Sequence, residues 1–266
     1  MEWQSLRFPT MQTDSVPFAI SLFAGMLLCI WMGYRIGQWR RRQDHEGAAA
    51  GLGAIEGAIF GLFGLMIAFT FSGAASRFDA RRQLIIAEAN AIGSAWHYLD
   101  LINPVQVGSL RQSFRNYIDA RIASFEKLPD VPAAEAELGR SAELYREIWD
   151  RAVKVCEEKN DSPTTMLLLG ALNEMSNIST SRTAALRIHP PSAIYALLFG
   201  LGLCSAIVAG YGMAASRRLS GMHTIVFAAV IGFCVFVIRD MEYPRLGVIR
   251  VTQTDRVMSD LRASMR

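Results

Sequence analysis

The stretch GAIFGLFGLMIAFTFSGAAS, residues 57–76, carries no charged residue and continues without a proline into RFDARRQLIIAEANAIGSAWHY, residues 77–98. About 20 apolar residues are what a helix needs to cross the hydrocarbon core of a bilayer. The second half instead has the charged, periodic pattern of a helix in water. We therefore predict one long helix, on the order of 60 Å, whose first half spans the membrane and whose second half leaves it. Gly57, Gly61 and Gly64 would let neighbouring helices approach it closely.

Composition places the chain among integral membrane proteins. Of its 266 residues, 52% are hydrophobic and 19% are charged, whereas soluble domains are roughly 25% charged. Four apolar runs in the sequence are long enough to cross a bilayer. The formal net charge is +3 and no block of five like charges occurs, which argues against a nucleic-acid partner. The expected surroundings are membrane lipid.

The four apolar runs predict an all-α membrane protein with four transmembrane helices and a helical middle domain. An N-terminal hairpin covers 1–76, with spans at about 16–38 and 55–76, and a C-terminal hairpin covers 192–240. Residues 77–191 have helical periodicity and no strand pattern, with breaks at 103–104 and 129–132. Residues 241–266 are a polar tail with a short amphipathic pattern from Asp255. An even number of spans places both ends and the middle domain on one side.

No catalytic arrangement is recognisable in the sequence. The chain has no GxSxG and no Walker-type sequence, and its four histidines and four cysteines lack the spacing of metal or redox motifs. We therefore expect no enzymatic activity, no cofactor and no metal. The cysteines are interpreted as small apolar side chains.

A group of charged residues lies just past the second span and comprises Arg77, Asp79, Arg81, Arg82 and Glu88. These side chains can pair along the helix at spacings of three and four residues. Alternatively, they can form a ring of charge at the mouth of a pore when several copies assemble. The sequence leaves both interpretations open.

A second charged feature is the tail motif RDMEYPRLG directly after the last span, which contains Asp240, Glu242, Pro244 and Gly247. With four spans, this motif and the first charged group lie near the same membrane surface. We therefore hypothesise that Asp240 and Glu242 pair with the arginines of the first group.

Two segments together resemble the bestrophin-like group of bacterial membrane proteins: IAFTFSGAASRFDARRQLIIAEANAIGSA, residues 67–95, and RDMEYPRLGVIRV, residues 239–251. The pattern of Phe69, Ala75, Arg77, Phe78 and Arg81 is also similar to the second-helix region of bestrophin anion channels. The layout of two spans, a helical middle, two spans and a tail is the same.

The resemblance implies a homo-oligomeric ion channel, with a pentamer favoured, whose cargo is inorganic ions. It implies a multi-pass protein of the bacterial inner membrane with the ends and middle domain in the cytoplasm. The second span would line the pore, and a hydrophobic neck would fall at Gly61, Leu65 and Phe69. Leu65 and Phe69 suit a constriction that gates by dewetting. Gly61 has no side chain to narrow a pore, and Phe60 or Phe63 would replace it on a rotated helix.

A non-conducting membrane anchor or sensor, whose helical domain binds a partner, is the alternative function. A secondary transporter would usually need more spans and a polar site near the bilayer midplane. The sequence shows no acidic run in its tail that would indicate calcium gating.

Overall fold

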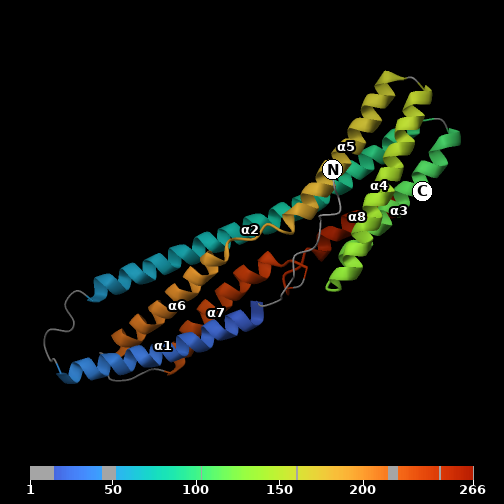
Figure 1. Cartoon of the computed structure of the whole chain (residues 1–266). Helices are drawn as coiled ribbons and strands as arrows, with labels where there is room; N and C mark the ends of the chain where they lie inside the picture. Colours follow the sequence, from blue (N-terminus) through green and yellow to red (C-terminus); the bar gives the residue numbers. More distant parts are fainter. Residues whose placement is uncertain are drawn as a thin grey trace. The chain divides into compact units, whose positions relative to one another are not determined.

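A computed structural model of the protein describes residues 15–43, 52–102, 104–159, 161–214, 221–245 and 247–265. In these ranges the regular secondary structure is helical and no strand occurs, which confirms the predicted all-α fold (Figure 1). The elements in order are α1 (Ser15–Gln43), α2 (Leu52–Tyr98), the 3-10 turn η2 (Leu99–Leu101), α3 (Pro104–Glu126), α4 (Val131–Lys159), α5 (Ser162–Ala185), α6 (Ser192–Met213), α7 (Gly221–Glu242) and α8 (Thr252–Ser264).

Four described helices are long and apolar enough to cross a membrane: α1, α2, α6 and α7. The protein is therefore an integral membrane protein with four transmembrane helices. The second span and the helix that follows it are one unbroken helix, α2, as predicted. Its 47 residues give a length of about 70 Å.

The spans form one compact unit, called here the membrane unit, in which α2 takes part up to Arg77. Its core is apolar and draws on all four helices: Leu22, Met26 and Ile30 of α1, Phe63 of α2, Leu198 and Ala206 of α6, and Ala228, Ile231 and Val235 of α7. Helix α1 packs against both α6 and α7, so the first span is held by the last two.

Glycines set how closely α1 and α6 approach. A Cβ atom added at Gly33 would collide with the carbonyl oxygen of Ile207, and one added at Gly210 would collide with the carbonyl oxygen of Ile30. In lipid there is little hydrophobic drive between helices, so close backbone contact at small residues supplies the van der Waals packing. The two helices meet backbone to backbone at both glycines.

The second compact unit, called here the helical unit, contains α2 from Phe78 onward, η2, α3, α4, α5, the segment from Pro244 and α8. Its core joins residues of every helix: Ile92, Phe114, Tyr117, Ile118, Ile148, Leu168, Leu172 and Met258 are among its buried members. Helix α8 packs against α3. The described part of the predicted polar tail, from Pro244 onward, belongs to this unit.

Candidate functional site

Helix α2 leaves most of its membrane-spanning half uncovered within a single chain. Phe63 and Ala74 are buried, at 3% and 0% exposure, and at 3.6 residues per turn they share one face of the helix. The opposite face carries only exposed residues, which we call the outer stripe: Ala54, Ala58, Gly61, Leu65, Phe69, Ser72 and Ser76.

The composition of the outer stripe differs from that of a lipid-facing surface. Apart from Leu65 and Phe69, which are 51% and 66% exposed, its members are alanine, glycine or serine. The exposed face of α7, by contrast, carries large apolar side chains, including Val226, Val230 and Phe233. Small residues are typical of surfaces where transmembrane helices meet other protein. The outer stripe is therefore suited to face further copies of the chain or a water-filled path.

The neck candidates lie on different faces of α2. Gly61, Leu65 and Phe69 lie on the outer stripe, and a Cβ added at Gly61 would meet nothing within 4 Å. Phe60 packs edge-on against Phe227 of α7, with ring centroids 6.1 Å apart. Phe63 lies in the core of the membrane unit. The suggestion that Phe63 lines a pore is therefore wrong, because its ring is enclosed by its own chain.

One of the hypothesised pairs between the charged group and the tail motif is present in the membrane unit. Nε and Nη2 of Arg77 donate to Oε1 of Glu242 at 2.8 and 2.5 Å. The Glu242 side chain is 1% exposed and that of Arg77 is 31% exposed. The pair joins the second span to the end of the last span. Asp240 is also buried, at 2% exposure.

We predict that reversing either charge of this pair, by Arg77→Glu or Glu242→Arg, lowers the thermal stability of the detergent-purified protein. Each reversal places like charges together, one of them buried. The double reversal should recover part of the loss, with a coupling free energy of about 1–3 kcal/mol. Thermal unfolding of the wild type, both single variants and the double variant measures this coupling free energy. Strictly additive losses would show that the pair contributes nothing.

Two members of the charged group lie at the surface of the helical unit. Asp79 and Arg82 form an ion pair at 3.2 Å across three residues of α2, with side chains 61% and 50% exposed. This agrees with pairing along the helix, and pairs of this kind contribute little to stability. Both charges remain available to solvent or to another chain.

Arg81 and Glu88, however, are buried within the chain, which corrects their assignment to a charged pore mouth. Arg81 is 5% exposed and Glu88 is 0% exposed. Arg81 donates from Nε and Nη2 to the carbonyl oxygens of Ala185 and Ile188, at 3.2 and 2.9 Å. These carbonyls lie at and just beyond the end of α5, where helical carbonyls lack partners of their own. A charge enclosed in this way cannot be presented to ions in a pore.

Glu88 lies between two buried arginines. Its Oε1 accepts a hydrogen bond from Nε of Arg121 at 2.7 Å, and its Oε2 accepts one from Nη1 of Arg182 at 2.5 Å. Burial alone would raise the pKa of Glu88, but the charges and hydrogen bonds of the two arginines hold that pKa below its usual value. The ionised carboxylate therefore ties α2 to α3 and α5.

The cluster extends to the tail motif through residues that sequence reasoning missed. Nη2 of Arg182 also lies 3.4 Å from Asp255 of α8, and Arg245 donates twice to the same carboxylate at 2.6 and 2.8 Å. Pro244 and Gly247 shape the segment that carries Arg245. The carbonyl of Pro244 accepts from the backbone of Val251 at 3.3 Å, and that of Gly247 accepts from Nε of Arg250 at 2.9 Å.

Comparison with known proteins gives the family. The family description "Bestrophin-like domain" matches residues 20–255. Crystal structures of a bacterial bestrophin homologue from Klebsiella pneumoniae, each with a different single substitution, are similar in fold. One has a TM-score of 0.70 at 14% identity and covers 92% of this chain and 99% of its own. Another has a TM-score of 0.67 at 13% identity and covers 96% and 100%.

At this level of identity the likeness of the solved structures establishes the fold alone. None of the curated proteins matches the chain. The family description, however, covers most of the sequence, including the whole of α2 and the tail motif. The resemblance found in the sequence is thereby confirmed, and the chain belongs to the Bestrophin-like family.

Proposed function

We propose that the protein is an ion channel in which several copies, with five favoured by analogy, assemble around the outer stripe of α2. The observation that carries this proposal is the stripe itself. It is an exposed face along a transmembrane helix, opposite the face that packs inside the chain, and apart from Leu65 and Phe69 its residues are small or hydroxyl-bearing. Membership of the Bestrophin-like family supports the same function. The proposed location is the bacterial inner membrane, with inorganic ions as the cargo.

Leu65 and Phe69 would form the constriction. They lie one helical turn apart, and small residues precede and follow them on the stripe. Where copies of α2 surround an axis, the two bulky side chains would narrow the path, whereas the alanines, Gly61 and the two serines would leave it wider. A ring of apolar side chains resists wetting, so the passage of ions would depend on how far that ring opens.

We expect Leu65→Ala and Phe69→Ala to raise the single-channel conductance or open probability severalfold, because each removes bulk from the constriction. Gly61→Leu should lower the current, since a side chain at this exposed position adds bulk to the path without disturbing the fold of the chain. Phe71→Ala is the matched control. Phe71 is 46% exposed but lies on another face of α2. Current recordings from the purified wild type and variants in planar bilayers compare their conductance and open probability.

If no current appears for the wild type or for any of these variants over a range of ions and voltages, the proposal fails. The membrane anchor or sensor would then be the better description. Native mass spectrometry of the detergent-solubilised protein gives a second test. A monomer would contradict the channel proposal, because the outer stripe of one chain cannot enclose a path.

A further inference from the structure

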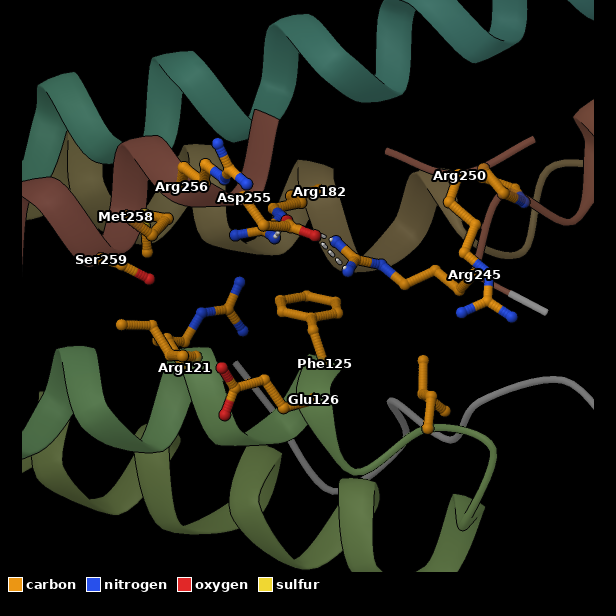
Figure 2. Close-up of a pocket in the computed structure, with 13 residues that line it drawn as sticks. Arg121, Phe125, Glu126, Arg182, Arg245, Arg250, Asp255, Arg256, Met258 and Ser259 are labelled. Atoms are coloured by element: carbon orange, nitrogen blue, oxygen red, sulfur yellow. Dashed lines mark hydrogen bonds and ion pairs between the residues drawn. The ribbon is translucent and has the colours of Figure 1, made fainter. Parts of the chain in front are cut away.

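A cavity of about 300 Å³ opens in the helical unit beside the buried cluster of Glu88 (Figure 2). This volume is at the lower end of the range for small-molecule sites. Its lining includes five arginines and two acids: Arg121, Arg182, Arg245, Arg250, Arg256, Glu126 and Asp255. In Figure 2 the ring of Phe125 and the guanidinium of Arg121 extend from α3, and Arg245 and Asp255 are joined by dashed lines.

The buried part of this cluster has more positive than negative charge. The side chains of Arg121, Arg182 and Arg245 are 1%, 4% and 9% exposed. In the part of the chain that the structure describes, their ion-pair partners are two carboxylates, Glu88 and Asp255. Buried charges are normally paired, because the desolvation of an uncompensated charge is costly. Three buried guanidiniums that share two carboxylates leave one positive charge without a counter-charge.

All three arginines also contact the ring of Phe125, which does not supply the missing charge. The guanidinium carbons of Arg121, Arg182 and Arg245 lie 5.5, 3.9 and 4.4 Å from the centroid of the Phe125 ring. An aromatic face attracts cations through its quadrupole but carries no net charge. Three positive guanidiniums therefore lie around one uncharged ring, where they repel one another.

Two further observations at Arg182 show that the cluster is incompletely compensated. Nε of Arg182 is buried and has no hydrogen-bond partner among the described residues. Burial, together with the charges of Arg121 and Arg245, lowers the pKa of Arg182 to about 10, although Glu88 acts in the opposite direction. The side chain is still protonated at neutral pH, so the cluster of three arginines and two carboxylates keeps its excess positive charge.

We propose that this cavity binds a phosphate group, either as free phosphate or as part of a small phosphorylated compound or a lipid headgroup. Planar guanidiniums match the oxygens of phosphate in bidentate hydrogen bonds. The charge also fits. The five lining arginines carry five positive charges, and Glu88, Asp255 and Glu126 carry three negative charges. A phosphate dianion would balance the difference of two. The site is independent of the proposed channel, because its evidence lies wholly within the helical unit.

The test is calorimetric titration of the full-length protein in detergent with inorganic phosphate, at constant ionic strength and with chloride as the comparison anion. Arg256→Gln should weaken phosphate binding on the order of tenfold, as expected for the loss of one charge-assisted contact. Glu126→Gln should strengthen binding a few-fold, because it removes a negative charge from the rim. Both residues are exposed, so neither change disturbs the buried pairs.

Arg262→Gln is the matched control, because Arg262 is on the same helix as Arg256 but pairs with Asp119 and does not line the cavity. It should change the affinity by less than about twofold. A second titration uses nanodiscs containing phosphatidic acid, with phosphatidylcholine alone as the blank. Binding of inorganic phosphate supports a soluble ligand, and binding only in the phosphatidic acid discs supports a lipid headgroup.

Three results would overturn the proposal. The first is no binding of either phosphate probe, and the second is equal binding of phosphate and chloride. The third is an equal affinity for phosphate in the Arg256, Glu126 and Arg262 variants. A failure of this kind would leave the channel proposal untouched, because the titration does not measure current. Conversely, a protein that never conducts can still bind phosphate more weakly as the Arg256 variant and more tightly as the Glu126 variant.

Discussion

Glu88→Ala is expected to lower the free energy of unfolding of the helical unit by about 3–5 kcal/mol, the usual result of removing one partner from a buried ion pair. The substitution leaves Arg121 without the carboxylate it contacts and leaves Arg182 with Asp255 alone. It also removes the ion pairs that link α2 to α3 and to α5. Urea unfolding of the detergent-purified protein, followed by tryptophan fluorescence, to which Trp96 and Trp149 of this unit contribute, measures the loss.

Asp79→Ala is the control for this prediction, because Asp79 is an acid on the same helix whose ion pair with Arg82 is exposed. Removing an exposed pair should change the free energy of unfolding by no more than about 1 kcal/mol. Equal losses for the Glu88 and Asp79 variants would show that the buried carboxylate contributes nothing special to the fold.

The same carboxylate sets a pH dependence whose sign follows from its lowered pKa. A group whose pKa is lower in the folded state contributes stability above its unfolded pKa, about 4.3 for Glu, and loses that contribution as the pH falls through the folded value. The wild type should therefore lose stability below about pH 4. Glu88→Gln should be less stable at neutral pH but should change less over the acidic range.

Gly210→Val is expected to destabilise the membrane unit by about 3 kcal/mol, at the upper end of the usual cost of overpacking. The new side chain would enter the space held by the carbonyl of Ile30, and a backbone atom cannot move aside as a flexible side chain can. Helix α6 would have to separate from α1. The melting temperature and the fraction of monodisperse protein after detergent extraction measure the effect.

Gly200→Val is the matched control on the same helix, because a Cβ added at Gly200 meets nothing within 4 Å. It should leave the melting temperature of the protein nearly unchanged. If the variants at positions 200 and 210 behave alike, the close approach of α1 and α6 is not what holds the membrane unit together.

The sequence predicted the spans and the continuity of α2 because these depend on local properties. A charge-free run of sufficient length requires the membrane, and an uninterrupted helical pattern without proline requires one helix. It did not predict which face of α2 packs inside the chain. The first half of α2 is apolar all round, so periodicity does not separate Phe63, which is buried, from Leu65, which is exposed.

The arginine cluster was not predictable from spacing for a different reason. Arginine is rarely buried, so Arg121 and Arg182 are expected at the surface of their helices. Their partner Glu88 lies on another helix, 33 and 94 residues away in the chain. Only the fold brings these charges together. Glu88 was noted as part of a charged group, but its own helix gives no sign of the partners that bury it.

The order of the helices along the chain has a consequence for biosynthesis. Helix α1 packs against α6 and α7, which are translated only after α3, α4 and α5. The helical unit likewise contains α8, whose Met258 is buried in its core. Because synthesis proceeds from the N-terminus, neither unit can complete its packing until the C-terminal helices have been translated. A ribosome that stops before α6 would release a chain in which neither unit is complete, so a truncated product is a natural target for proteolysis.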